Sequence, residues 1–391
     1  MSICPIEKLI QFDLLDDCIH TPAGYYHFYR YYPPNTDIMT EEEKKAEIEQ
    51  MTQLFDTLAR EIAIFATDKI EDMSEIKRFY KNLAPEYDHL TSDIIAAIES
   101  TESRNSAAVQ RAFYFIIRTD KQEESVYNQI AGKGYHINKA QREELAVLLR
   151  NYYLREFISA EIYTLEKELK QDVKLRKKIE KKPELFQKEL QRRLLPHSME
   201  FFPSFAVQNG TYRSTMMLKN FPFEIGSCCL LQTACMRGTS FMMRLTPMNG
   251  REIKKLTEKQ MNKSSYKRSS TQATDQLEGL SEQTALAEFY QAVSNSQTTL
   301  FFVSVYIECY GRNEEDLQST IRAVEEKLIT ANISAERLIR QQREGFLSVS
   351  PLGRDYFLAD ANNFPSQTVA ACYPCSYSSR LDPVSYTHLT L

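Results

Sequence analysis

The chain has 391 residues, of which 42% are hydrophobic and 26% charged, a composition ordinary for a globular protein of two or three domains. Its net charge of −5 at pH 7 argues against a protein whose whole surface binds nucleic acid. The sequence has no run of about 18 apolar residues, and its acidic start lacks the basic and apolar regions of a signal peptide. We therefore expect a cytoplasmic protein.

Residues 1–137 predict an N-terminal α/β domain. Alternating residues from Ile10 to Tyr32, with a turn at Pro22–Gly24, predict a pair of strands. Thr40, followed by glutamates that include Glu43, predicts a capping box at the start of a long helix. Apolar runs at 62–67 and 111–119 then predict two further strands.

Residues 138–200 predict a charged helical connector. Apolar residues keep helical spacing to about residue 162, and the stretch 167–193 is then rich in charge and interrupted by Pro183. This pattern predicts a helical arm between two globular parts.

Residues 201–345 predict a second α/β domain. Strands are expected at 212–218, 240–246 and 299–310, with a helical stretch over 249–295 and a helix that Asn313 caps. Helices alternating with strands favour an α/β or α+β fold, for which ferredoxin-like split units are one arrangement. We find no internal repeat of fixed period. Residues 346–382 look like a loop.

The sequence carries no motif for binding a nucleotide. A P-loop needs Gly-x-x-x-x-Gly-Lys-Ser/Thr, and the nearest stretch, Gly132–Gly134, has neither that spacing nor the hydroxyl residue. A dinucleotide-binding Gly-x-Gly-x-x-Gly is absent as well. We therefore predict no catalytic, cofactor-binding or metal-binding residues in this chain.

The cysteines and histidines favour structural roles. Eight scattered cysteines are typical of reduced thiols, and Cys372 and Cys375 form a lone Cys-x-x-Cys without the second pair that a zinc site needs. The six histidines show no metal-ligand spacing. An unrelated enzyme, with a site assembled from dispersed residues, stays open as an alternative.

One basic stretch is a candidate for binding an anionic partner. Its members are Lys174, Arg176, Lys177, Lys178, Lys181 and Lys182. Acidic residues on either side favour a solvated helix face, and a nucleic-acid-binding module is the second alternative. We interpret a later basic group in the same way, and it comprises Lys254, Lys255, Lys259, Lys263, Lys267 and Arg268.

Five segments follow one another in a characteristic order between Met199 and Pro383. They are TYRSTMMLKNFP, SFMMRLTPMNGREIKKLTEKQ, TLFFVSVYIECYG, NEEDLQSTIRAVEEKL and SVSPLGRD. This order resembles the region before the motor domain in the ATPases of conjugation and type IV secretion. Residues 1–197 are similar, less specifically, to the N-terminal region of that family.

The resemblance implies a docking and assembly module. In that family a RecA-like motor domain with a P-loop follows this region, so ATP and Mg²⁺ are implied only for that motor. The expected partners are type IV secretion channel subunits at the inner membrane, with a homo-oligomer formed by the full-length protein. We expect the module to be peripheral on the cytoplasmic face of the membrane, and direct DNA binding stays open. Residues 383–391 look like a non-native tail on a truncated gene.

Overall fold

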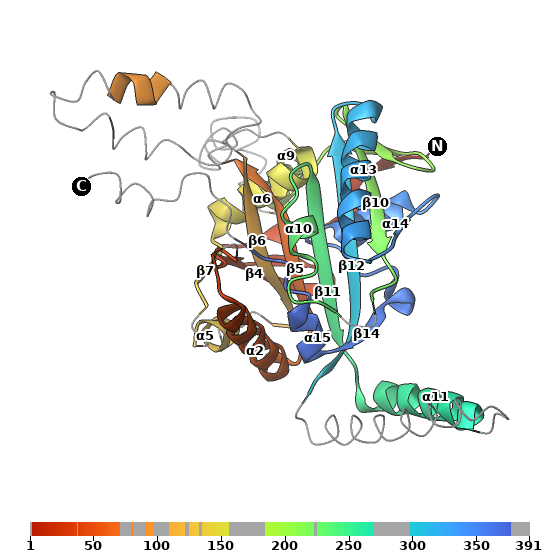
Figure 1. The fold of residues 1–391 in the computed structure, drawn as a ribbon. Helices are drawn as coiled ribbons and strands as arrows, with labels where there is room; N and C mark the ends of the chain where they lie inside the picture. Colours follow the sequence, from red (N-terminus) through yellow and green to blue (C-terminus); the bar gives the residue numbers. More distant parts are fainter. Residues whose placement is uncertain are drawn as a thin grey trace.

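The computed structural model describes residues 2–36, 38–70, 80, 91–96, 109–121, 125–132, 135–155, 184–222, 225–268 and 298–376. Within them, fourteen strands form one mixed α+β arrangement around a single sheet, in which every strand pair is antiparallel. The main path runs β1-β8-β9-β10-β12-β11-β5-β6-β4-β3-β2 (Figure 1).

Six elements near the N-terminus form what we call unit A. They are β4 (Gly24–Tyr31), α2 (Glu41–Leu58), β5 (Ile62–Ile70), β6 (Val109–Thr119), α5 (Ser125–Ala131) and β7 (Ile137–Lys139). β6 lies between β4 and β5, and β7 pairs with the other edge of β4. The strand order of unit A is therefore β7-β4-β6-β5.

Six later elements form unit B with the same order. They are β10 (Thr211–Leu218), α10 (Leu231–Ala234), β11 (Thr239–Pro247), β12 (Leu300–Gly311), α13 (Glu314–Thr330) and β13 (Ala335–Arg337). β12 lies between β10 and β11, and β13 pairs with β10. Each unit thus has the connectivity of a split β-α-β-β-α-β motif. The topology repeats where the sequence showed no fixed period.

The two units join edge to edge through β5 and β11. Five residue pairs, from Phe241 opposite Ala66 to Leu245 opposite Ile62, hold this seam. The seam corrects the expectation of two sheet-and-helix domains joined by a helical arm, because one sheet crosses both predicted domains. The pairing leaves β5 and β11 without an exposed backbone edge, and their apolar side chains are buried in the cores on the two faces of the sheet.

Shorter elements extend the sheet at both ends. They are β1 (Ser2–Pro5), α1 (Ile6–Leu9), β2 (Asp13–Leu14), β3 (Ile19–Thr21), β8 (Ser198–Phe201) and β9 (Ala206–Gln208). β1 and β2 end the path of eleven strands, yet only residues 6–12 separate them. Those residues can span about 27 Å, whereas the path laid flat would extend about 48 Å. The sheet therefore curls.

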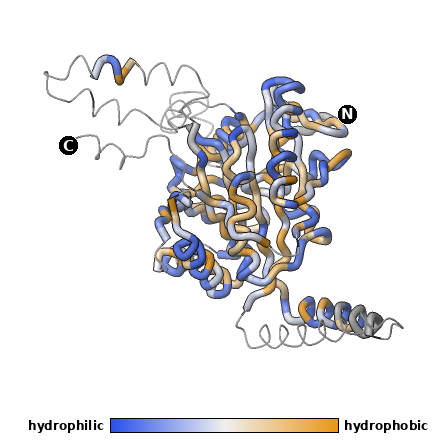
Figure 2. The backbone as a smooth tube through the Cα atoms, in the orientation of Figure 1, coloured by the Kyte–Doolittle hydropathy of each residue, from blue (hydrophilic) through white to orange (hydrophobic). Residues whose placement is uncertain are grey.

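Each face of the sheet has its own core. The concave face packs against α1, α6 (Arg142–Leu154), α9 (Glu184–Leu194) and α14 (Gln342–Val349). The outer face packs against α2, α5, α10, α13 and α15 (Ser366–Ala371). Hydrophobic colours follow the central strands in Figure 2, and hydrophilic colours gather on outer helices such as α2 and α13.

Local sequence signals placed the long elements. Thr40 and Glu43 form the predicted capping box, in which the Glu43 amide donates to Thr40 Oγ1 at 3.3 Å. Asn313 caps α13, as predicted, and the expected strands at 111–119, 212–218 and 299–310 are confirmed as β6, β10 and β12.

Two predicted segments differ from the structure. The predicted connector 138–200 contains α6 and α9, whose apolar sides are buried against the sheet, and its middle part, 156–183, lies outside the described residues. The predicted loop 346–382 contains η2 (Leu358–Asp360), β14 (Asn362–Pro365), which pairs with β12, and α15. The predicted tail 383–391 lies outside the described residues. Among the described helices, none is both long and apolar enough to cross a membrane.

Candidate functional site

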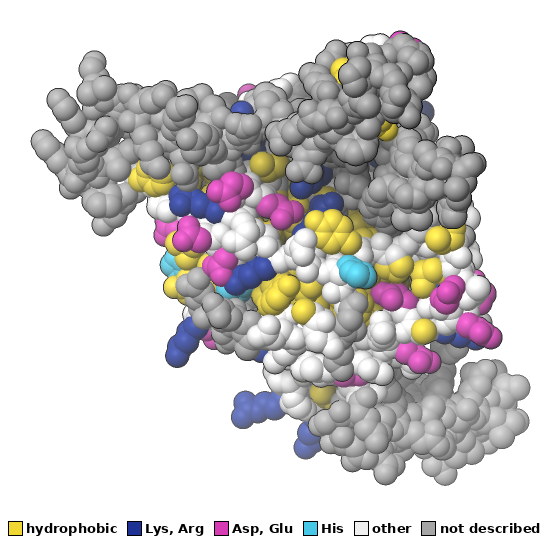
Figure 3. Space-filling model, turned by 90° about the vertical axis from the view of Figure 1, so that its left-hand side faces the viewer, with side chains coloured by type: hydrophobic (Ala, Val, Ile, Leu, Met, Phe, Trp, Pro, Cys, Tyr) yellow, Lys and Arg dark blue, Asp and Glu magenta, His cyan; other side chains and the backbone are white. Residues whose placement is uncertain are grey.

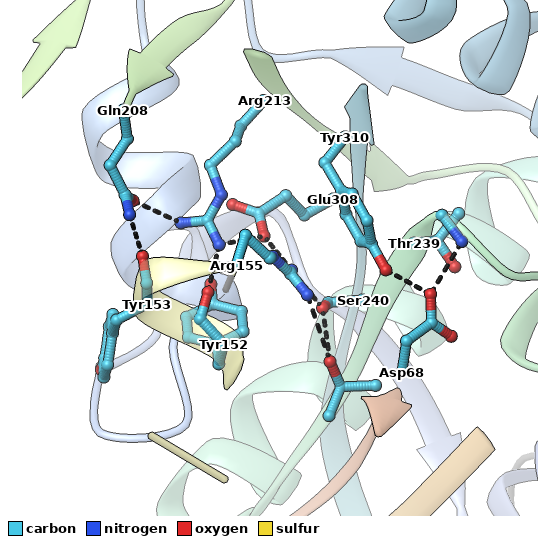
Figure 4. A network of polar contacts seen from close by, with 12 residues as sticks. Asp68, Tyr152, Tyr153, Arg155, Gln208, Arg213, Thr239, Ser240, Glu308 and Tyr310 are labelled. Atoms are coloured by element: carbon cyan, nitrogen blue, oxygen red, sulfur yellow. Dashed lines mark hydrogen bonds and ion pairs between the residues drawn. The ribbon is translucent and has the colours of Figure 1, made fainter. Parts of the chain in front are cut away.

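Polar residues replace the apolar ones where the seam between the units ends. The β5–β11 pairing stops at Phe241 and Ala66. Beyond it lie Thr67 on β5 and Ser240 on β11, whose hydroxyl oxygens are 3.1 Å apart. The buried network of Figure 4 fills this end of the seam and draws on both units.

Glu308 of β12 lies at the centre of the network and is completely buried. Its Oε2 accepts a hydrogen bond from Arg155 Nη2 at 3.0 Å and lies 3.6 Å from Arg213 Nη2. Its Oε1 has no hydrogen-bond partner among the described residues. One carboxylate oxygen therefore forms ion pairs with two arginines.

Arg155 reaches Glu308 from the end of α6. This residue caps α6 in a left-handed conformation, with φ of 52°, which turns its side chain into the seam. It also donates to Ser240 Oγ at 2.7 Å, and its guanidinium lies 4.0 Å from the ring centre of Tyr310. Burial acts to lower the pKa of Arg155, but Tyr310 and Glu308 more than offset it, so the pKa is raised.

Arg213 of β10 completes the contact with α6. It donates to Gln208 Oε1 at 3.3 Å and to the backbone oxygen of Tyr152. Burial lowers the pKa of Arg213 despite the nearby carboxylate of Glu308. Arg213 therefore connects the end of α6 to unit B.

A second ion pair lies on the other side of the seam. Arg111 of β6 donates to Asp68 Oδ1 at 2.9 Å, and both side chains are almost fully buried. Arg111 also donates to the backbone oxygens of Ala234 at 2.7 Å and Thr239 at 2.6 Å. Asp68 accepts from the Gly238 amide at 2.8 Å and from the Tyr310 hydroxyl.

The network is suited to holding the units together rather than to chemistry. Its three arginines donate to protein oxygens, and the central groups are cut off from solvent. Buried ion pairs are weak evidence for stability, but removing one partner leaves an uncompensated charge and is strongly destabilising. The network therefore favours one pairing of β5 with β11. Isolated charges within apolar strands, such as Arg111 and Glu308, were the sequence signal for it.

The Ser348–Gly353 segment is a second buried structure on the concave face. Arg244 of β11 donates to the backbone oxygens of Ser348 and Ser350, each at 2.8 Å. The hydroxyls of Tyr153 and Ser350 also share a hydrogen bond. A Cβ added at Gly353 would lie 1.7 Å from the backbone oxygen of Leu347, so only glycine fits there.

The predicted anionic-partner residues are not brought into this site. Lys174, Arg176, Lys177, Lys178, Lys181 and Lys182 lie outside the described residues. In the later basic group, Lys254, Lys255 and Lys259 are exposed on α11 (Gly250–Arg268), and Lys254 lies 3.9 Å from Glu258. The face in Figure 3 likewise mixes acidic, basic and hydrophobic side chains.

The Cys-x-x-Cys residues are buried in the outer-face core. Cys372 and Cys375 are both fully buried near the end of α15. The described ranges contain no cluster of three or more histidine, cysteine or acidic residues that could hold a metal. His20 lies 3.7 Å from Asp13 on a partly exposed strand pair, and His27 is buried in β4.

The chain matches no protein-family model, and a comparison with curated proteins gives no match.

Proposed function

We propose that the chain is the N-terminal docking and assembly module of a conjugal-transfer (type IV secretion) ATPase that powers translocation of DNA or protein. Its partners are channel subunits at the inner membrane and sister copies of the ATPase. It acts on the cytoplasmic face of that membrane, and ATP and Mg²⁺ bind in a separate motor domain.

The Ser348–Gly353 segment is the observation that supports this proposal best. The resemblance rests on this segment together with the order of the elements. Its buried backbone oxygens accept hydrogen bonds from Arg244, and its glycine cannot be replaced by a residue with a side chain. A segment constrained in this way suits the exit from a packed module into a following domain. The two-unit sheet, with a core on each face, suits a rigid platform.

A competition experiment in donor cells tests the docking role. Overproducing the 391-residue chain beside a conjugation system of this kind should lower transfer frequency by at least about tenfold. A tenfold change corresponds to about 1.4 kcal/mol in binding free energy. The control is Val305→Pro, which removes a ladder hydrogen bond from the central strand β12 and should unfold the module. Unchanged transfer with the folded chain present in excess contradicts the proposal.

An ATPase assay tests the division of labour. The purified chain should show no turnover above a buffer control, because its sequence lacks a phosphate cradle. Robust, protein-dependent hydrolysis would instead favour the dispersed-site enzyme.

A further inference from the structure

Five cysteines of the outer-face core lie on either side of α10 and just after α15. They are Cys228, Cys229, Cys235, Cys372 and Cys375. None of the five forms a disulfide bond. Cys372 and Cys375 belong to the buried core, and the other three are half-buried against it. A group of thiols at one junction raises the question of which two can react with each other.

Backbone hydrogen bonds bring Cys229 and Cys372 together. The Cys228 amide donates to the Ala371 oxygen at 2.8 Å, and the Leu230 amide donates to the Cys372 oxygen at 3.3 Å. Cys229 therefore lies between two residues that are bonded to the end of α15. The thiols of Cys229 and Cys372 are themselves in hydrogen-bonding contact. A disulfide needs such closely paired backbones, with Cα atoms about 4.4–6.8 Å apart.

The two thiols differ in the way that a reactive cysteine and its partner should differ. The Cys372 thiol donates to the sulfur of Cys229, which lowers the pKa of Cys229 and raises that of Cys372. Cys229 is also only half-buried, whereas Cys372 is fully buried. A small oxidant therefore meets the more acidic thiol first.

We propose that Cys229 is a peroxide-oxidisable thiol, that Cys372 is its resolving partner, and that their disulfide fixes the end of α15 to the segment before α10. This inference does not depend on the proposed function. It assigns the reactive pairing across the fold rather than within the Cys-x-x-Cys sequence.

The chemistry needs one equivalent of a hydroperoxide. The Cys229 thiolate attacks a peroxide oxygen, the O–O bond breaks, and the leaving hydroxide or alkoxide takes up a proton, which gives a sulfenic acid. The Cys372 sulfur then attacks the Cys229 sulfur, the S–O bond breaks, and the proton of Cys372 leaves with the hydroxyl as water. Two thiols are oxidised and one peroxide is reduced.

The position of Cys375 argues against a Cys372–Cys375 bond. Cys372 and Cys375 are both fully buried, so neither offers a small oxidant an exposed sulfur to attack first, and burial also raises the pKa of Cys375. The hydroxyl of Tyr373, which lies between the two cysteines in the sequence, forms a hydrogen bond with the Tyr31 hydroxyl at 2.6 Å. This bond restrains the backbone movement that a Cys372–Cys375 bond would need.

Peptide mapping of the intact chain tests the pairing. The protein is treated with one equivalent of hydrogen peroxide, unfolded in N-ethylmaleimide and digested with trypsin without reduction. We expect a linked pair of peptides, 220–237 and 355–380, whose fragment spectra join Cys229 to Cys372 and which dithiothreitol separates. The oxidised protein should also melt about 3–5 °C higher, because the bond closes a long loop.

Adjacent cysteines supply matched control variants. Cys229→Ser and Cys372→Ser should abolish the linked peptides, whereas Cys228→Ser and Cys375→Ser should retain them. The map of the unmodified chain decides the question even where a variant folds poorly. A Cys372–Cys375 bond, a sulfinic acid on Cys229 beside a reduced Cys372, or two unreacted thiols would each overturn the proposal.

Discussion

Units A and B share one strand order but cover the outer face of the sheet in opposite ways. The first crossover of unit A carries the 18-residue α2 and its second the 7-residue α5. In unit B the first crossover has the 4-residue α10 and the second the 17-residue α13. α15 lies beside α2 and is bonded to the segment before α10 (Figure 1). A repeated strand order therefore still needs a later helix to complete its outer layer.

The units also differ at equivalent positions on their middle strands. Ile116 of β6 faces Phe28 and Ala63, whereas Glu308 of β12 faces Thr215 and Ser240. Each position is flanked by the first two strands of its own unit. Unit A is therefore apolar at this position, whereas unit B carries a buried carboxylate that two arginines share.

The largest expected effect tests that charged position. Glu308→Gln keeps the side-chain shape but removes the charge that Arg155 and Arg213 share. We expect the free energy of unfolding to fall by about 3–5 kcal/mol, measured by urea denaturation. Glu325→Gln is the control, because Glu325 pairs with Arg337 on the surface, and it should cost about 0–1 kcal/mol. Equal losses would contradict a special role for Glu308.

The next largest effect concerns the segment that follows unit B. Gly353→Ala places a Cβ against the Leu347 oxygen, so we expect a loss of about 3 kcal/mol in urea denaturation. Gly226→Ala meets open space and should change the free energy of unfolding by less than about 0.5 kcal/mol. A tolerated Gly353→Ala would show that the segment is not part of the core.

A smaller effect tests whether α15 completes the outer layer. Val369→Ala removes two methyl groups from a buried position, and we expect a loss of about 2 kcal/mol by thermal or urea unfolding. The exposed neighbour Gln367→Ala should be close to neutral. If both variants match the parent chain, unit B does not need α15.

Alkaline pH should weaken the packing of α6 on the sheet. Burial, and then Glu308, raise the pKa of Tyr152 well above the ordinary tyrosine value of 10.0. Above about pH 10 the unfolded chain therefore loses a proton that the folded chain keeps, and stability falls as pH rises. Tyr152→Phe should reduce this slope by about 1.4 kcal/mol per pH unit, measured by urea denaturation from pH 9 to 11. An unchanged slope would refute the assignment.

The smallest effects compare the starts of the two long outer helices. Thr40→Ala removes the capping box of α2, and Asn313→Ala removes the side chain that accepts from the Asp316 amide in α13. Each should cost about 1 kcal/mol in urea denaturation. Thr40→Ser and Asn313→Asp keep a capping oxygen and should lose much less. A large difference between the two alanine variants would show that one unit depends more on its cap.

Local patterns predicted the long elements but not their assembly. Thr40, Asn313 and the alternation along β12 are signals within a few residues, and all three elements formed where expected. The pairing of Ile64 with Met243 joins distant parts of the chain, and no local pattern names that partner. The prediction of two separate domains therefore missed the strand pairing that joins them into one sheet.

The candidate site was harder to predict for the same reason. Its charges come from α6, β5, β6, β10 and β12, so only the folded chain brings them together. The sequence analysis assigned β14 and α15 to a loop because both elements are short and follow residues typical of turns. The partner of Cys372 likewise lies far away in sequence rather than three residues on.

The seam has a consequence for synthesis on the ribosome. β5 ends at Ile70, but its partner β11 is complete only at Pro247. At a synthesis rate of roughly 5–20 residues per second, the edge of β5 stays unpaired for about 9–35 seconds before β11 is made. Nascent unit A therefore exposes an unpaired apolar strand edge, the kind of surface that chaperones cover and that aggregates when they do not.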